Sequence, residues 1–216
     1  MKIQIISLFP EMFDGVLSAS MLHKAQAAGL VSFSQINLRD FGLGPRRQVD
    51  DTPYGGGDGM LLRPEPLFSA VEKAKTIDPG AKVYLMTPRG KQFDQAMARS
   101  IAGQPDNMII VCGRYEGYDE RVVTLVDQQL SIGQYVLTGG ELPAMVVIDA
   151  VVRLLPGVLG GKTSALIESF TDPGTLEYPQ YTRPEEFRGL RVPEVLLSGH
   201  HQQIEDWRAQ HSSKTG

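Results

Sequence analysis

Three loops of the sequence combine residue types that can hold a small ligand. Residues 87–91 (TPRGK) and 113–119 (GRYEGYD) are rich in glycine and arginine, and each follows an apolar run. In residues 131–140 (SIGQYVLTGG), glycines bracket a short apolar core. Because glycine lets the main chain come close to a ligand, such a segment offers main-chain donors and acceptors beside an apolar slot. That combination suits a purine ring.

An arginine at the end of an apolar helix is a second candidate for chemistry. Residues 141–155 (ELPAMVVIDAVVRLL) are apolar almost all round, which in a helix indicates burial on both sides and favours a subunit interface. Arg153 lies near the end of this helix, just before a flexible segment. It is either a site residue or the ion-pair partner of Asp149, four residues earlier. The sequence leaves both interpretations open.

The common nucleotide and metal motifs are not present in the sequence. The run from Gly157 to Thr163 (GVLGGKT) has one residue too few for a P-loop, and no Gly-x-Gly-x-x-Gly follows the first apolar run. His200 and His201 are adjacent, with no further His or Cys at ligand spacing, so a helix start or an interface is favoured over a metal site. The glycine run at 55–59 (GGGDG) is by itself a weak sign of close backbone approach to a ligand.

Strands and helices in alternation must position these loops. Such an alternation predicts an α/β fold with a mainly parallel sheet. Ligands of these sheets bind beyond the carboxyl ends of the strands, where residues 87–91 and 113–119 are expected. The predicted strands are residues 2–8, 31–38, 82–87 and 107–112. The predicted helices of this part are residues 12–28, 64–75 and 92–101.

Composition divides the chain into three parts. Residues 1–155 carry the alternation and are expected to form the ligand-binding domain. Residues 156–180 hold many Gly, Pro, Ser and Thr residues, which is typical of a flexible linker. Residues 181–216 are predicted to be helical with a polar tail. Since about forty residues rarely form an independent core, this unit is expected to pack on the first domain or on another subunit.

The overall composition is that of an ordinary globular protein, with 42% hydrophobic and 21% charged residues among 216. The single Cys112 excludes an internal disulfide and a zinc cluster, and no charged-then-apolar leader begins the chain, so a reduced cytoplasmic location is expected. The longest apolar run is too short to cross a bilayer, so no membrane association is expected.

The formal net charge of −4 argues against a protein that coats nucleic acid without specificity. A local basic surface would still suffice for phosphate contacts. Each candidate cluster is small, and solvated surface arginines are the alternative interpretation. The candidates are Arg46, Arg47, Arg89, Lys91, Arg183, Arg188 and Arg191.

A series of motifs along nearly the whole chain resembles one enzyme family. The sequence is similar to the bacterial tRNA (guanine-37-N1)-methyltransferases, which are knotted methyltransferases of the SPOUT class. No single motif decides this, but so many in the correct order are very improbable by chance. The motifs are ISLFPEMFD (6–14), RRQVDDTPYGGGDGM (46–60), CGRYEGYDER (112–121), SIGQYVLTGGELPAM (131–145), RLLPGVLG (153–160), YPQYTRP (178–184), VPEVLLSGHH (192–201) and Trp207 with Arg208.

The resemblance implies a homodimer whose α/β domain contains a deep trefoil knot, followed by a small helical C-terminal domain. S-adenosylmethionine would lie bent in the knot, with its adenine on backbone groups of residues 132–137. The C-terminal unit of the partner subunit would clamp the anticodon stem-loop of tRNA, and the linker would order over the active site when tRNA binds. The cofactor-binding residues that it implies are Pro88, Gly113, Glu116, Ile132, Gly133, Gln134, Tyr135, Val136, Leu137, Gly139, Gly140 and Pro143.

The resemblance also implies two catalytic residues for methylation at N1 of guanine 37. N1 carries a proton, so the reaction needs a base to remove it and a positive group to stabilise the charge that develops on O6. Glu168 in the linker matches the family's base, and Arg153 matches its arginine. The target base must leave its stack to reach the methyl group. Assistance by a divalent ion such as magnesium is left open, and no metal ligands are assigned.

Two positions depart from the family pattern. The family's base is usually aspartate, whereas Glu168 is one methylene longer. The family's usual aspartate in the cofactor segment is Gln134 here, which removes a negative charge near a cationic cofactor. The stretch after Phe170 is one residue longer than the family pattern, and the chain ends soon after Trp207. These departures motivate the alternative function, a non-catalytic or weakly active RNA-binding relative with the same fold.

Overall fold

The computed structural model describes residues 1–104, 106–160, 168–172 and 174–214 of the chain. The chain divides into two compact units, Met1–Leu159 and Gly160–Gly216. The first unit holds the sheet and its helices, and the second holds short strands and two helices.

The first unit is built on a five-stranded sheet with the order β2-β1-β6-β5-β7. All neighbouring strands in it are parallel, as the alternation of strands and helices predicts. The central strand β6 is buried along its whole length, which is typical of a strand covered on both faces. The strands are β1 (Lys2–Ser7), β2 (Ser32–Asn37), β5 (Lys82–Gln92), β6 (Met108–Cys112) and β7 (Gln128–Ser131). The trefoil knot stays a prediction, because strand pairing does not define how the chain threads.

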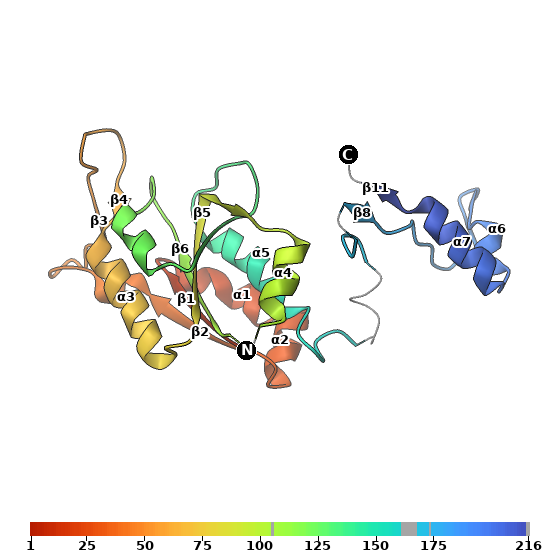
Figure 1. The fold of residues 1–216 in the computed structure, drawn as a ribbon, viewed down its shortest axis with the longest axis horizontal. Coiled ribbons are helices and arrows are strands. Elements are labelled where there is room, and N and C mark those ends of the chain that lie inside the picture. The colour runs from red at the N-terminus through yellow and green to blue at the C-terminus, as the bar shows by residue number, and fades with distance from the viewer. Residues whose placement is uncertain (105, 161–167, 173, 215–216) are drawn as a thin grey trace. The chain divides into compact units, whose positions relative to one another are not determined.

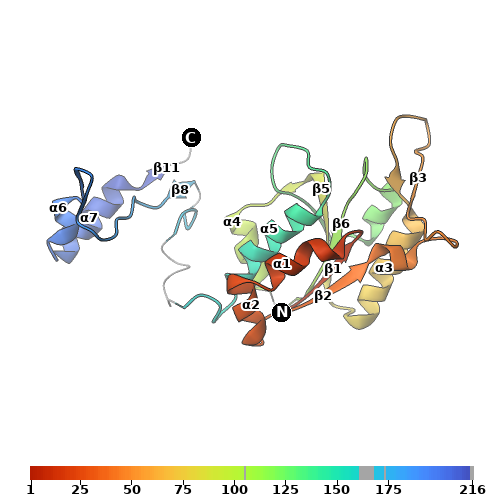
Figure 2. The same cartoon turned by 180° about the vertical axis from the view of Figure 1, so that it is seen from behind.

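Helices cover both faces of the sheet (Figure 1; Figure 2). Adjacent residues of β6 point to different layers, because Ile109 packs in the cluster that contains α3 and Ile110 in the cluster that contains α5. The sheet therefore separates two apolar cores. On one face lie α3 (Pro64–Ile77) and the 3-10 helices η2 (Leu38–Phe41) and η3 (Glu120–Leu125). On the other face lie η1 (Pro10–Phe13), α1 (Asp14–Leu17), α2 (Ser20–Ala27), α4 (Gln95–Ala102) and α5 (Glu141–Val152).

Strand β5 contains a bulge that leads into the candidate site. Met86 and Lys91 both pair with Leu130 of β7, so the residues between them leave the ladder. Gly90 is required there, since a Cβ at this position would overlap the backbone of Leu130. The predicted strand 82–87 therefore extends further, and the helix predicted from residue 92 begins only after Asp94, which caps α4.

Two further predictions for the first unit need correction. The helical segment expected over residues 12–28 is divided into η1, α1 and α2, because Ala19 is extended and Ser20 has a φ of +50°. Strand β7 was missed, because its sequence QQLS lacks the apolar run that identified the other strands. The helix expected over residues 141–155 is confirmed as α5, which ends at Val152, but its face with Leu142, Val146 and Asp149 is exposed in the chain.

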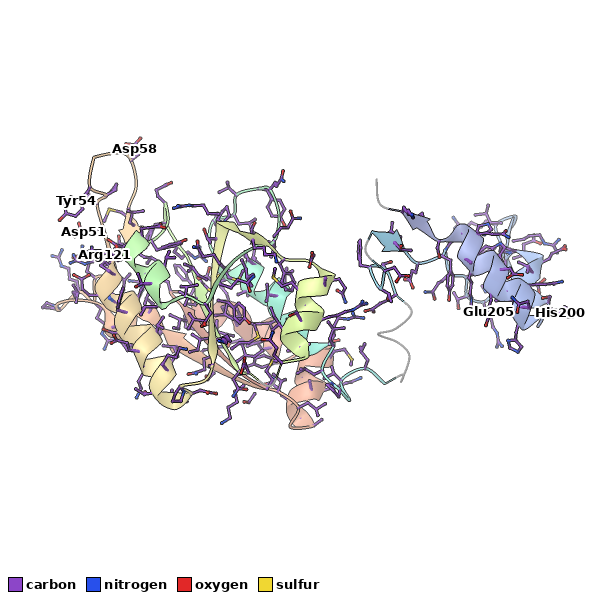
Figure 3. The ribbon with its side chains drawn as sticks, viewed as in Figure 1. Asp51, Tyr54, Asp58, Arg121, His200 and Glu205 are labelled. Carbon is purple, nitrogen blue, oxygen red and sulfur yellow. The ribbon has the colours of Figure 1, made fainter. Side chains whose placement is uncertain are left out.

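A short antiparallel hairpin carries the glycine run of the first unit. It pairs β3 (Asp50–Asp51) with β4 (Leu61–Leu62), and Tyr54 and Asp58 lie on the loop between these strands (Figure 3). Glycines at 55, 56 and 57 have φ values between +81° and +119° and open space where a Cβ would lie. These three glycines therefore serve the backbone conformation of the loop rather than close packing.

The second unit differs from its prediction in its strands. Residues from 181 onward were expected to be helical, but they begin with a β-hairpin whose turn contains Arg188 and Gly189 at positive φ. His200 is the N-cap residue of α7, which confirms the helix start expected there (Figure 3). The elements of this unit are β8 (Thr175–Leu176), β9 (Glu186–Phe187), β10 (Leu190–Arg191), α6 (Glu194–Leu197), α7 (His201–His211) and β11 (Ser213–Lys214), which pairs with β8.

Candidate functional site

A cavity of about 470 Å³ is lined by residues at the carboxyl ends of β5, β6 and β7. Its volume lies in the range of small-molecule and cofactor sites, roughly 300–1,000 Å³. Three loops line it, namely the β5 bulge, the loop after β6 and the loop after β7. The sequence predicts a ligand site beyond the carboxyl ends of the strands, and the cavity lies there.

The residues that the resemblance assigned to the cofactor come together at this cavity. Gln134 lines an adjoining pocket, with Tyr135 and Val136. Their role toward a cofactor stays a prediction. The assigned residues that line the main cavity are Pro88, Gly113, Glu116, Ile132, Gly133, Tyr135, Val136, Leu137, Gly139, Gly140 and Pro143.

Several lining residues were missed by the sequence analysis. Leu61, Met86 and Leu130 are apolar residues of strands, which carry no motif and read as core. Arg114 and Tyr115 belong to the loop GRYEGYD, which was singled out as a whole without a role for each side chain. Leu61 can be found only from the strand pairing, which places its neighbour Leu62 of β4 beside Tyr118 of this loop.

The loop after β6 is held in an uncommon backbone conformation. Tyr115 has a φ of +60°, which is rare for a bulky residue and costs of order 1–3 kcal/mol. Hydrogen bonds to the β4 segment hold the loop, since Glu116 N–H donates to Met60 O (3.0 Å) and Leu62 N–H donates to Gly117 O (2.9 Å). Burial, and then the charge of Asp50, raises the pKa of Tyr115.

The side chain of Glu116 fits only beside a residue without a side chain. A Cβ on Gly59 would overlap Glu116 Cγ, and Gly59 has a φ of +85°. The last glycine of the GGGDG run thus has a role in close packing, which the first three lack. It lets the carboxylate of Glu116 lie at the edge of the cavity.

The loop after β7 presents apolar side chains beside main-chain groups. Val136 is 84% exposed and Tyr135 is 55% exposed, so a bound ligand could cover apolar surface here. The Ser131 hydroxyl stabilises the start of the loop, because it donates to Gly133 O (3.0 Å) and accepts from Gly133 N–H (3.3 Å). The sequence predicts an apolar slot with backbone donors for a purine ring in this loop, and purine binding here stays a prediction.

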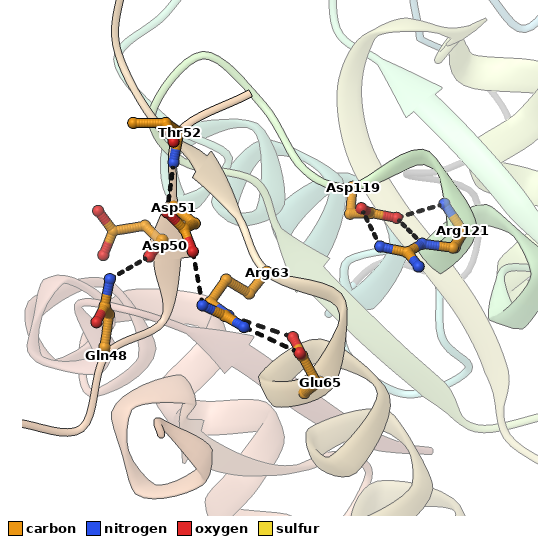
Figure 4. A network of polar contacts seen from close by, with 8 residues as sticks. All are labelled: Gln48, Asp50, Asp51, Thr52, Arg63, Glu65, Asp119 and Arg121. Carbon is orange, nitrogen blue, oxygen red and sulfur yellow. Dashed lines mark hydrogen bonds and ion pairs between the residues drawn. The ribbon is translucent and has the colours of Figure 1, made fainter. Parts of the chain in front are cut away.

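A network of ion pairs lies beside the β3–β4 hairpin (Figure 4). Arg63, the N-cap residue of α3, contacts Asp51 (2.7 Å) and Glu65 (3.0 Å). The hydrogen bond from Arg63 lowers the pKa of Glu65, and the hydrogen bond from Arg121 lowers the pKa of Asp119. The network ties the hairpin that carries Leu61 to the start of α3, although exposed pairs of this kind each contribute about 0–1 kcal/mol.

The two predicted catalytic residues belong to different units. Arg153 is the C-cap residue of α5 and is half-buried, and its backbone N–H donates to Asp149 O (3.1 Å). Glu168 lies in a turn of the second unit, where its backbone N–H donates to Thr171 Oγ1 (3.3 Å) and its carbonyl accepts from Thr171 N–H (3.1 Å). Their catalytic roles stay predictions, as does the ion pair of Arg153 with Asp149.

Three other expectations concern metals, membrane spans and the rejected P-loop. Within residues 1–104, 106–160, 168–172 and 174–214, no three His, Cys, Asp or Glu side chains are grouped so that they could hold a metal ion. The same residues include no helix with the length and apolar character needed to cross a bilayer. Part of the run first considered as a P-loop, residues 161–163, lies outside the described residues.

The fold and the cavity together define a parallel α/β protein with a cofactor-sized site at the carboxyl edge of its sheet. Comparison with known families narrows this class. The chain belongs to the family described as tRNA (Guanine-1)-methyltransferase TrmD, whose family model matches residues 1–216. The resemblance noted in the sequence is therefore confirmed over the whole chain.

Individual relatives agree with this assignment. A tRNA (guanine-N(1)-)-methyltransferase of Geobacter sulfurreducens is 57% identical over 211 residues, covering 97% of this chain and 85% of that protein. The protein of the same description from Halalkalibacterium halodurans is 56% identical over 216 residues, covering 99% of this chain and 87% of the relative. The crystal structure of a tRNA (m1G37) methyltransferase from Aquifex aeolicus is similar with a TM-score of 0.82 and 39% identity, covering 98% of this chain and 88% of that one. The α/β fold class is thereby confirmed.

Proposed function

We propose that this chain is an S-adenosylmethionine-dependent enzyme that methylates N1 of guanine 37 in tRNA, next to the anticodon. The observation that carries the proposal is the match of the whole chain to the methyltransferase family, together with a cofactor-sized cavity lined by that family's motif residues. A cytoplasmic location follows from a tRNA substrate and is part of the proposal.

The residues of the cavity fit S-adenosylmethionine by their chemistry. The exposed apolar side chains after β7 suit the adenine, and the backbone groups of residues 132–137 are the donors and acceptors proposed for its edge. The carboxylate of Glu116 suits the cationic part of the cofactor. When bound, the cofactor supplies an electrophilic methyl group. Gln134 lines the adjoining pocket and adds no charge to balance the sulfonium.

The protein must make guanine N1 nucleophilic. We assign Glu168 as the base that accepts the N1 proton, because its carboxylate can do so and it matches the family's catalytic carboxylate. Arg153 is assigned to stabilise the negative charge that develops on O6. The methylene that Glu168 has beyond aspartate changes its reach but keeps the same acid-base chemistry.

A homodimer is part of the proposal, and α5 supports it. Leu142 and Val146 of this helix are about half exposed, at 51% and 48%, on a face that also carries the exposed Asp149. An apolar stripe on a helix that is already buried on its other side fits a second copy of this chain. In the dimer, the carboxyl-terminal unit of the partner would hold the anticodon stem-loop. Assistance of the reaction by a divalent ion such as magnesium is part of the proposal, and no residue is assigned to hold the ion.

A methyl-transfer assay tests the function directly. Radiolabelled S-adenosylmethionine and an unmodified tRNA transcript with guanine 37 should give labelled tRNA, and a transcript with adenine at position 37 should give none. A chain that binds this tRNA but transfers no label would instead be the non-catalytic RNA-binding relative that Gln134 and Glu168 suggest as the alternative.

A further inference from the structure

A buried ion pair joins the loop after β6 to the start of α5. Arg114 Nε lies 2.8 Å from Glu141 Oε2, and the two side chains are 15% and 1% exposed. Neither atom has a well-directed hydrogen bond in the described part of the chain, so charge attraction holds the pair. Removing one partner of a buried pair leaves the other charge uncompensated. The buried position of each charged side chain is therefore stable only while the other is present.

Further contacts tie the pair to the end of β1. The hydroxyl of Ser7 donates to Glu141 Oε1 (2.7 Å), and the same hydroxyl accepts from Phe9 N–H (2.9 Å). The guanidinium of Arg114 lies 4.5 Å from the centre of the Phe9 ring, which adds a cation–π contact. Both members of the pair are thus held at the end of β1, Glu141 by Ser7 and Arg114 by Phe9.

The last residues of the loop after β7 lie directly against this pair. Arg114 Nη1 donates to Thr138 O (3.3 Å), and Arg114 and Gly139 form an antiparallel bridge. A Cβ on Gly139 would overlap Arg114 and lie 2.6 Å from Glu141 Oε2. Gly139 lines the cavity. The position of this part of the cavity wall therefore depends on the positions of the Arg114 and Glu141 side chains.

We propose that Arg114 and Glu141 are positioning residues for the cofactor. They act through Gly139 and Thr138, and they hold the loops after β6 and β7 in the arrangement that binds it. The inference rests on the proposed function, because it takes S-adenosylmethionine as the ligand of the cavity. A site formed in advance binds more tightly, since the apparent Kd is the intrinsic Kd divided by the competent fraction.

Glu141→Gln is the central variant. It keeps the size of the side chain and can accept the Ser7 hydrogen bond, but it removes the charge that faces Arg114. If the competent fraction falls to about a tenth, the Kd for S-adenosylhomocysteine, measured by calorimetry with the full chain, rises about tenfold. The KM for S-adenosylmethionine should rise in parallel, while kcat at saturating cofactor and the KM for tRNA stay within about twofold of the parent.

Two further variants separate positioning from folding. Arg114→Lys keeps the positive charge but lacks the planar group that reaches Thr138 and lies over Phe9, so it should fold and also raise the Kd. Lys82→Met is the matched control, because it removes an exposed ion pair with Asp127 (3.4 Å) at the other end of β5 and should keep the parent Kd. If Glu141→Gln does not fold, the Kd of Arg114→Lys for S-adenosylhomocysteine tests the proposal in its place.

Each result has one meaning. Folded variants that bind S-adenosylhomocysteine with the parent Kd would overturn the inference, even if their melting temperatures fall, because the pair would then serve stability alone. A folded Arg114→Lys protein that binds S-adenosylhomocysteine with the parent Kd would also overturn the inference. A parent protein that binds neither S-adenosylmethionine nor S-adenosylhomocysteine would overturn the proposed function itself, and the inference with it.

Discussion

The backbone N–H of Gly140 donates a 2.8 Å hydrogen bond to the carbonyl oxygen of Gly113. This bond joins the loop after β6 to the residue that precedes α5, and both glycines line the cavity. A Cβ on Gly140 would lie 2.7 Å from Gly113 N and 2.8 Å from Cys112 Cα, and these backbone atoms cannot turn aside as a side chain could. The two loops can therefore meet only because residue 140 has no side chain.

Gly140→Ala should weaken cofactor binding and stability together. The added methyl group must push the two loops apart, which costs about 1–3 kcal/mol of the free energy of unfolding, as for other overpacked sites. We expect a Kd for S-adenosylhomocysteine raised at least about tenfold, measured by calorimetry beside urea denaturation. Gly15→Ala is the control, because nothing lies within 4 Å of a Cβ there and the residue is helical. A Gly140→Ala protein as stable and as tightly binding as the parent would contradict the steric argument.

Glu168→Gln should slow the chemical step. The amide keeps the size of the carboxylate but cannot accept a proton, so the single-turnover rate should fall by a factor on the order of 100 or more. The Kd for tRNA should barely change. Glu168→Asp restores the shorter side chain usual in the family and should turn over at the parent rate or faster.

Asp172→Asn is the matched control for this carboxylate. Asp172 lies four residues further along, and its carbonyl oxygen accepts from Thr175 N–H (3.0 Å). If Glu168→Gln keeps the parent rate and Asp172→Asn loses it, the base is Asp172.

Arg153→Ala should lower turnover far more than cofactor binding. A group that stabilises charge only in the transition state contributes about 3 kcal/mol or more to the barrier, so kcat should fall about 100-fold or more. Rate and melting temperature must be measured on the same preparation. A variant that unfolds would favour the ion pair with Asp149 as the role of this arginine.

Val146→Glu should separate the dimer. A charge placed in an apolar contact between subunits loses its hydration without gaining a partner. The mass in solution should fall from about twice 23.7 kDa to 23.7 kDa, and tRNA methylation should fall with it. Ile77→Glu serves as the control, because Ile77 is an exposed apolar residue at the end of α3, and its variant should keep the parent mass. A parent protein that is a monomer at micromolar concentration would contradict the proposed dimer.

Stability should fall at alkaline pH through Cys112. Burial, and then the nearby charge of Glu141, raises the pKa of this thiol well above its ordinary value. The folded state therefore keeps the proton that the unfolded chain releases above pH about 8.5. Because the folded state then binds more protons, the free energy of unfolding decreases as pH rises, by up to about 1.4 kcal/mol per pH unit. We would measure the free energy of unfolding by urea denaturation between pH 8 and about 10. It should fall less steeply with pH for Cys112→Ala than for the parent, and an equally steep fall in both proteins would exclude this cause.

Sequence patterns predicted the elements whose burial is one-sided or complete. The strands β1 and β6 and the helix α5 were found, because their burial requires apolar residues that stand out in the sequence as a run. Strand β7 carries two glutamines and gains its place from pairing with β5, which no local pattern records. The hairpin β9–β10 was missed for a related reason, since its exposed strands show no apolar alternation.

The candidate site was predictable where glycine and charge mark a loop. The loops after β5, β6 and β7 were expected to meet at one edge, and the cavity joins them. The contribution of Leu61 could not be expected, because it depends on the pairing of β4 with the loop after β6. The dependence of Arg114 on Glu141 is likewise a product of the fold, since 27 positions separate them in the sequence.

The bulge in β5 gives this protein room to change over evolutionary time. Because the residues between Met86 and Lys91 leave the ladder while both ends pair with Leu130, a residue inserted between them would lengthen the bulge and leave the register of β5 on β7 unchanged. A slip of the register by one residue would instead turn every following side chain to the opposite face of the sheet. Since the bulge lines the cavity, changes in its length can reshape the ligand site while the sheet keeps its arrangement.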